Sequence, residues 1–264
     1  MKEYKGAVFF DFDGTLVDER EKLYIPTDAT KNSIERLKLN GYMVGLATGR
    51  AKCYVPETGI DFDCYVTSNG AYAAVDDKII ADEVFGADEL KTLFKFFAEN
   101  NMGYMTENQE QCFYSTANYD QFEEMINKFN ISMVCFSPMP ADSNIKANKM
   151  MFTYDDESAL EKLRGEFSDK YYMTKHRHDP SGDLGIKGIT KAGGIQKVID
   201  VFGLDIADTY AFGDGENDYE MLSSVGHGIA MGLHSEKLDG IAEYVTDTVI
   251  NEGVTKALKK YGLI

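Results

Sequence analysis

Short apolar runs alternate with amphipathic stretches along the first eighty residues of the chain. An apolar run at Ala7–Phe10 gives way to a polar loop, and Thr27–Asn40 then spaces its apolar residues as a helix does. Two further apolar runs, Tyr42–Ala47 and Cys64–Thr67, predict strands. Strands that alternate with helices of about a dozen residues indicate a parallel sheet covered by helices.

The same rhythm returns after residue 187. The pattern predicts helices at Lys191–Phe202 and Tyr219–Val225, and strands at Thr209–Phe212 and Gly228–Met231. We therefore expect residues 1–81 and 187–264 to form one α/β domain with a Rossmann-like parallel sheet. In such sheets ligands bind at the carboxyl ends of the strands.

The middle of the chain has a different texture. Amphipathic helices are expected at Asp88–Asn100 and Asp120–Asn130, and strands at Gln111–Ser115, Met150–Tyr154 and Tyr171–Thr174. This mixture predicts an α+β domain, residues 82–186, inserted into the first domain by short connections near Ala81 and Ile186.

Composition narrows the classes of partner. The chain has 264 residues, 44% of them hydrophobic, and a formal net charge of −17, which argues against a nucleic-acid partner. No apolar stretch approaches the roughly 18 residues of a membrane span. The amino terminus lacks a secretory pattern, so a cytoplasmic location is expected.

The four cysteines show no CxxC or Cys/His metal spacing and are expected to be reduced thiols. Nothing in the pattern indicates an oligomeric state.

Two carboxylates follow the first apolar run. Asp11 and Asp13 are two positions apart, so in an extended segment they point to the same side, and Gly14 allows a sharp turn after them. Such carboxylates at the edge of a core need a cationic partner. One could attack an electrophile while the other carries a proton. The alternative is a simple turn with Asp as a local cap.

Two further segments could bind an anion. In Gly45–Arg50, an apolar run ends in Thr48 and Gly49 before a predicted helix, where a hydroxyl and backbone N–H groups could cradle a phosphate. The alternative is an N-cap threonine. Lys191 opens a predicted helix, where the dipole disfavours a cation, and a bound phosphate would compensate. The alternative is a solvated lysine.

The segment Tyr210–Leu222 repeats the pattern of the first run. Its apolar part ends at Gly213, and four oxygen-bearing side chains follow within five residues: Asp214, Glu216, Asn217 and Asp218. Such a density of hard ligands suits Mg²⁺. An ordinary turn would leave the mutual repulsion of these charges uncompensated.

Together these segments resemble the haloacid dehalogenase (HAD) superfamily of phosphohydrolases, and more narrowly its Cof-like branch with an inserted α+β cap of type IIB. The resemblance rests on DFDGTLVD, LATGR, KGITKAGGI and GDGENDYEML, which occur in the family's order. It extends to SNGA at 68–71, GIAMG at 228–232 and NEGVTKAL at 251–258. It covers the residues of the expected HAD-like core.

The resemblance implies a role for each matched residue. Asp11 would be the nucleophile that forms an aspartyl-phosphate, and Asp13 the acid that protonates the leaving oxygen and then the base that activates water. Mg²⁺ would be held by the carboxylates of Asp11 and Asp214 and by the main-chain carbonyl of Asp13. Asp218 would orient Lys191 or a metal-bound water. The phosphoryl group would be bound by Thr48, Gly49, Lys191 and Asn217.

The expected function is a Mg²⁺-dependent phosphomonoester hydrolase of small phosphorylated metabolites. Sugar phosphates are the first candidates, and flavin and pyridoxal phosphates are others. Further substrate contacts could come from Asn69, Arg50 and Arg177, although the basic loop around Arg177 could equally be solvated. A sugar phosphomutase would use the same aspartyl-phosphate chemistry. A non-enzymatic phospho-receiver or binding module is less consistent with Asp13 and with an inserted domain.

Overall fold

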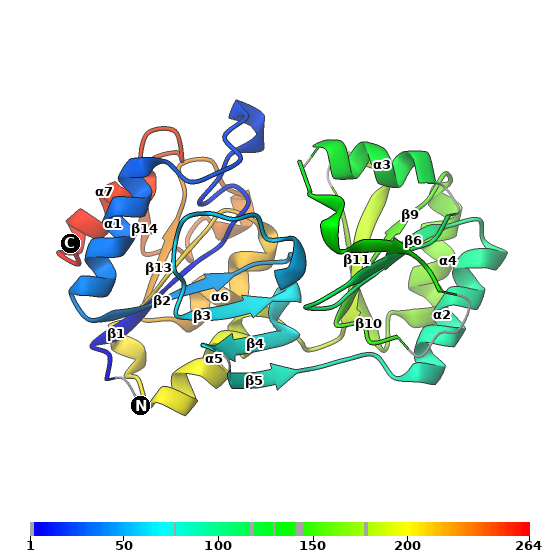
Figure 1. Ribbon diagram of the computed structural model, residues 1–264, viewed down its shortest axis with the longest axis horizontal. Helices are drawn as coiled ribbons and strands as arrows, with labels where there is room; N and C mark the ends of the chain where they lie inside the picture. The colour runs from blue at the N-terminus through cyan, green and yellow to red at the C-terminus, as the bar shows by residue number, and fades with distance from the viewer. Residues whose placement is uncertain (1–2, 77, 117–118, 129, 141–144, 177–178) are drawn as a thin grey trace. The chain divides into compact units, whose positions relative to one another are not determined.

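The computed structural model describes residues 3–76, 78–116, 119–128, 130–140, 145–176 and 179–264 (Figure 1). The chain divides into two compact units. The core unit consists of Met1–Gly49, Pro56–Ala81 and Thr190–Ile264. The inserted unit consists of Arg50–Val55 and Asp82–Ile189, so a short segment that follows Gly49 belongs with it.

The core unit is built on an eight-stranded sheet with the order β14-β13-β12-β1-β2-β3-β4-β5. From β14 to β3 every neighbouring pair is parallel, and β4 runs antiparallel to β3. The strands are β1 (Gly6–Phe10), β2 (Tyr42–Ala47), β3 (Cys64–Thr67), β4 (Tyr72–Val75), β5 (Lys78–Asp82), β12 (Thr209–Gly213), β13 (His227–Ala230) and β14 (Tyr244–Val245).

Four α-helices of the described chain belong to the core unit: α1 (Asp28–Leu39), α5 (Lys191–Phe202), α6 (Tyr219–Ser224) and α7 (Gly253–Lys260). Helix α1 packs on β2 and α7, whereas α5 and α6 pack on each other (Figure 1). Ala7 and Phe9 of β1 share a buried cluster with Ile195 of α5 and Met221 of α6. All five residues of β1 are buried, as expected for a strand covered on both faces.

The inserted unit contains a six-stranded sheet with the order β10-β11-β9-β6-β7-β8, in which only the described pair β7–β8 is parallel. Its elements are α2 (Ala87–Glu99), β6 (Gly103–Glu107), β7 (Cys112–Tyr114), α3 (Tyr119–Lys128), β8 (Phe136–Pro138), β9 (Lys149–Thr153), α4 (Glu157–Phe167), β10 (Tyr171–Lys175) and β11 (Ser181–Ile186).

Alternate side chains of strand β9 pack into buried clusters on the two faces of this sheet. Met150 and Phe152 belong to a buried cluster with residues of α2 and α4. Met151, which points the other way, belongs to a second cluster with Phe122 of α3 and Tyr54. The segment Arg50–Val55 therefore packs on the same face of this sheet as α3.

The structure confirms the α/β fold class and, with one exception, every helix and strand predicted above, with small shifts at the ends. It corrects one expectation, because Gly49 is followed by a 3₁₀ turn at Lys52–Tyr54 (η2) and not by an α-helix. The sequence pattern missed α4, α7 and the strands β4, β5, β6, β8, β11 and β14. Among the residues described, no helix is both long enough and apolar enough to cross a membrane.

Candidate active site

Two aspartates meet where two neighbouring strands end. Asp11 follows β1 directly and Asp214 follows β12, and these strands are parallel with Phe10 opposite Phe212. The backbone N–H of Asp11 donates to the carbonyl of Phe212 at 2.9 Å, which fixes the register at this edge. Carboxylate oxygens of Asp11, Asp214 and Asp218 lie within 4.8 Å of one another. The sheet thus gathers negative charge at the carboxyl ends of its strands.

Lys191 supplies the positive charge of this cluster. Its Nζ lies 2.5 Å from Oδ1 of Asp11 and 2.7 Å from Oδ1 of Asp218, and the side chain is 1% exposed. Lys191 is the first residue of α5, where the helix dipole opposes a cation. In this structure two carboxylates offset that opposition, a role that the sequence pattern had suggested for phosphate.

Asp218 is itself held in place by the backbone. Its Oδ2 accepts hydrogen bonds from the N–H groups of Asp214 and Gly215, both at 2.9 Å. These bonds stabilise a 3₁₀ turn, Glu216–Asp218, which Asp214 and Gly215 connect to the end of β12. Because Oδ1 remains for Lys191, one buried carboxylate connects the loop of Asp214 to the ammonium group.

The protonation of the carboxylates reflects their crowding. Burial first, and then the charge of Asp218, raises the pKa of Asp11 from 3.8 to about 7, although Lys191 acts in the opposite direction. Burial and the charges of Asp11 and Asp218 also raise the pKa of Asp214 well above its ordinary value. The charge of Asp13 contributes to both shifts. For Lys191, burial alone would lower the pKa, but Asp11 and Asp218 outweigh it and the pKa is raised.

Gly14 allows the first loop to approach Asp214 closely. Its φ is +83°, and a Cβ at this position would lie 2.3 Å from the carboxylate of Asp214. The next residue, Thr15, is buried, and its hydroxyl donates to Oδ1 of Asp214 at 3.5 Å. Thr15 was not among the sequence candidates, although its place directly after Gly14 in the same loop was a usable signal.

A third group of candidates lies around Asn69. Asn69 is buried in the left-handed backbone region, at a φ of 54°, and its N–H donates to the carbonyl of Thr48. Its Oδ1 accepts a hydrogen bond from Asn217 at 3.1 Å and would lie 3.1 Å from a Cβ at Gly49. The structure therefore brings Thr48, Gly49, Asn69 and Asn217 together. A strained backbone of this kind is common at functional sites.

Three other sequence candidates remain to be accounted for. Glu216 is exposed and pairs with Lys237, with Oε2 2.6 Å from Nζ, so it is not part of the buried cluster. Arg50 is buried and belongs to the inserted unit. Arg177 lies outside the described residues.

A sheet with parallel central strands, and with a carboxylate cluster and a buried lysine at their carboxyl ends, is typical of hydrolases of the HAD type. The chain belongs to the haloacid dehalogenase-like hydrolase family, which it matches over residues 8–258. This match confirms the resemblance read from the four motifs and, with it, the expected class of enzyme.

Individual relatives align with nearly the whole of this chain. A Bacillus subtilis (strain 168) protein named "Putative phosphatase YkrA" is 28% identical over 97% of this chain and 98% of its own length. The 5-amino-6-(5-phospho-D-ribitylamino)uracil phosphatase YitU of the same strain is 26% identical over 99% of both chains. The HAD subclass IIB sugar phosphatase BT4131 aligns with a TM-score of 0.84 at 26% identity, over 98% of this chain and 99% of its own.

Proposed function

We propose that this protein is a Mg²⁺-dependent phosphomonoester hydrolase of small phosphorylated metabolites that works through an aspartyl-phosphate on Asp11. The observation that carries the proposal is the position of Lys191, whose Nζ lies between Asp11 and Asp218 beside a third carboxylate, Asp214. Phosphoryl transfer requires charge neutralisation and positioning above all.

The carboxylate cluster suits a hard divalent cation. Asp218 is already engaged by Lys191 and by two backbone N–H groups, so Asp11 and Asp214 are the side chains left to ligate it. The carbonyl of Asp13 is the third ligand that the family resemblance implies. Burial and the neighbouring carboxylates raise the pKa values of Asp11 and Asp214, and Lys191 offsets this rise only in part. When bound, Mg²⁺ would neutralise these carboxylates and the phosphate oxygens.

The reaction would proceed in two displacements. In the first, a carboxylate oxygen of Asp11 forms a bond to phosphorus, the ester P–O bond breaks, and Asp13 gives its proton to the leaving oxygen. In the second, Asp13 removes a proton from water, the water oxygen bonds to phosphorus, and the bond to Asp11 breaks. Inorganic phosphate leaves and both aspartates return to their starting states.

Four residues are proposed to hold the phosphoryl group. Lys191 would neutralise its charge, while Thr48, Gly49 and Asn217 would donate hydrogen bonds. Support comes from the contacts of Asn69, which connect the loop of Thr48 to Asn217. Asp218 would act as a positioning residue, because it holds Lys191 through a rigid, backbone-bonded carboxylate.

We propose sugar phosphates as the first substrate class and assign substrate selection to the inserted unit. The likeness to the sugar phosphatase BT4131 supports this order of candidates. The likeness to YitU makes phosphorylated flavin precursors the second class to test. Arg50 and Arg177 remain predicted substrate contacts, and a cytoplasmic location remains a prediction.

The test is phosphate release from a panel of phosphorylated metabolites, with kcat/KM compared across sugar, flavin-precursor and pyridoxal phosphates. We expect turnover with Mg²⁺, loss of turnover with EDTA, and no turnover by Asp11→Asn. Turnover that survives both EDTA and Asp11→Asn would contradict the proposal. Product analysis identifies a phosphomutase, which would return the phosphoryl group to a sugar. A stable phosphoprotein without phosphate release would identify a phospho-receiver.

A further inference from the structure

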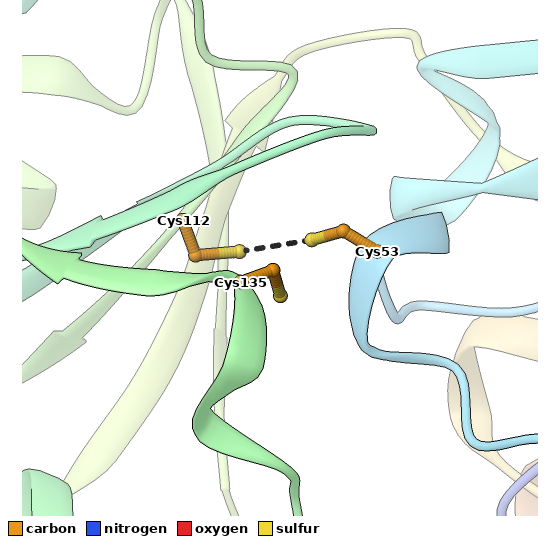
Figure 2. Close-up of side chains that lie close together, drawn as sticks. All are labelled: Cys53, Cys112 and Cys135. Carbon is orange, nitrogen blue, oxygen red and sulfur yellow. Dashed lines mark hydrogen bonds between the residues drawn. The ribbon is translucent and has the colours of Figure 1, made fainter.

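Three of the four cysteines, which are all free thiols, converge within the inserted unit. Cys53 lies on the η2 turn, Cys112 is the first residue of β7, and Cys135 ends a 3₁₀ turn, Met133–Cys135 (η4), just before β8. Figure 2 shows the three side chains meeting from these separate segments. Cys53 and Cys112 are 59 positions apart, so no short sequence motif announces the cluster.

The spacing of the sulfur atoms suits a shared ligand. The Sγ atoms of Cys53 and Cys112 are 3.5 Å apart, and all three Sγ atoms lie within 4.8 Å of one another. A disulfide requires about 2.05 Å, so these are separate thiols in contact. Three thiolates at about 2.3 Å from a tetrahedral metal ion would be about 3.8 Å apart. Small side-chain adjustments therefore convert the observed arrangement into a three-sulfur site.

The backbone holds two of the cysteines next to each other. Strands β7 and β8 pair in parallel with Cys112 opposite Phe136, so Cys135 comes immediately before the residue that faces Cys112. The side chain of Gln111 donates to the carbonyl of Cys135 at 2.9 Å, which ties the start of β7 to the η4 turn.

The η2 turn is fixed against the same sheet by polar contacts on both sides of Cys53. The N–H of Lys52 donates to Oε1 of Gln109 at 3.1 Å, and the Tyr54 hydroxyl donates to the buried carboxylate of Glu107 at 2.5 Å. Cys53 itself contacts the carbonyl of Asn108 at 3.4 Å. The three sulfurs are therefore held together before any ligand arrives.

The surroundings of the sulfurs select the kind of ligand. Cys112 belongs to the apolar cluster that contains Phe136 and Met151, and Cys53 and Cys135 pack against it while remaining partly exposed. An ion can therefore reach the sulfurs, which lie in an environment with few competing oxygen ligands. The nearby carboxylate of Glu107 is engaged by Tyr54 and by Lys149, whose Nζ is 3.0 Å from Oε1.

We propose that Cys53, Cys112 and Cys135 bind one thiophilic d¹⁰ cation, Zn²⁺ or Cu⁺, through three thiolates. Soft sulfur ligands select such ions over Mg²⁺, so this site is separate in chemistry from the carboxylate cluster of the core unit. Each thiol that ligates the ion releases its proton to solvent. Zn²⁺ would complete its coordination with water, whereas Cu⁺ is satisfied by the three sulfurs.

The test uses the full-length, reduced, metal-free protein and measures binding directly. Co²⁺ is titrated as an optical probe for the Zn²⁺ site, with thiolate-to-cobalt charge-transfer absorption as readout and Zn²⁺ as competitor. Cu⁺ is titrated anaerobically against a colorimetric chelator. We expect one thiolate-bound ion per chain. The variants Cys53→Ser, Cys112→Ser and Cys135→Ser should each bind at least about tenfold more weakly, since even the loss of an outer partner costs that much.

The matched control is Cys64→Ala, because Cys64 is the remaining cysteine and lies buried in β3 of the core unit. Its metal binding should equal that of the unmodified protein. Circular dichroism and thermal unfolding check that each variant is folded. The proposal would be overturned if the triple serine variant bound Zn²⁺ and Cu⁺ each as tightly as the unmodified protein does. Formation of a Cys53–Cys112 disulfide in a protein that binds neither ion would also overturn it, and would assign the cluster to redox chemistry.

Discussion

The ammonium group of Lys191 lies 2.5 Å from a carboxylate oxygen of Asp11, although 180 positions separate the two residues in the chain. Both groups are buried, and Asp218 shares the ammonium at 2.7 Å. The contact joins the end of the central strand β1 to the start of α5. One ion pair therefore contributes both to the packing of the core unit and to the charge balance of the proposed active site.

Replacing Lys191 should weaken both roles. In Lys191→Met two buried carboxylates lose their cation, a change that costs about 3 kcal/mol or more in the free energy of unfolding. Loss of a donor to the transferring phosphoryl group should lower kcat by about 10²–10³-fold. Chemical denaturation and phosphate release measure the two effects. Lys197→Met, on the same helix α5, is the matched control and should leave kcat unchanged.

Asp11 and Asp13 should fail at different steps when each is changed to asparagine. Asp11→Asn removes the nucleophile, so no phosphoenzyme forms. Asp13→Asn retains the nucleophile but loses proton transfer, which is worth about 10²–10⁴-fold. With p-nitrophenyl phosphate, whose leaving group needs little protonation, the Asp13 variant should accumulate phosphoenzyme because water is no longer activated.

Rapid-quench measurement of protein-bound phosphate separates these outcomes. Asp28→Asn is a suitable control, since its side chain is 96% exposed at the start of α1. A phosphoenzyme in Asp11→Asn, or none in Asp13→Asn, would show that the roles are assigned wrongly.

Residues at strand ends were predictable, because Asp11 and Asp214 each follow a strongly apolar run and parallel strands end at one edge. The hydrogen bond between Asn69 and Asn217 was not, since it joins loops whose positions depend on the folded sheet. Strand β5 was missed because its apolar run, residues 79–81, is only three residues long, and the strand lies mostly exposed at the edge of the sheet. The Cys53, Cys112 and Cys135 cluster escaped detection because tertiary packing, and not spacing in the sequence, brings the sulfurs together.

The metal-free protein should lose stability as the pH rises through the titration of Asp11. The pKa of Asp11 is raised from 3.8 to about 7, chiefly by burial, so between these values the folded state binds more protons than the unfolded chain. The free energy of unfolding therefore falls as the pH rises from about 4 to 7. Asp11→Asn should show a flatter profile in denaturant titrations with EDTA present.

Asp247 provides a control, because its pKa is shifted in the opposite direction from that of Asp11. Its hydrogen bonds with Lys256, with the N–H of Thr248 and with Asn251 lower its pKa to about 2, so any stability that it contributes is lost only as the pH falls below about 4. Asp247→Asn should therefore leave the profile between pH 4 and 7 unchanged relative to the unmodified protein. Parallel profiles for Asp11→Asn and the unmodified protein across this interval would contradict the assignment.

Gly14→Ala should impair Mg²⁺ binding through a steric effect on Asp214. The new Cβ would lie 2.3 Å from the Asp214 carboxylate, so this side chain must move, and the φ of +83° adds strain of about 1 kcal/mol. We expect the Mg²⁺ concentration for half-maximal activity to rise at least about tenfold. Gly240→Ala is the matched control, because Gly240 has a φ of +81° with nothing within 4 Å of the added Cβ. If this Mg²⁺ concentration rose similarly in both variants, backbone strain alone would explain the effect. A rise confined to Gly14→Ala would support Asp214 as a ligand.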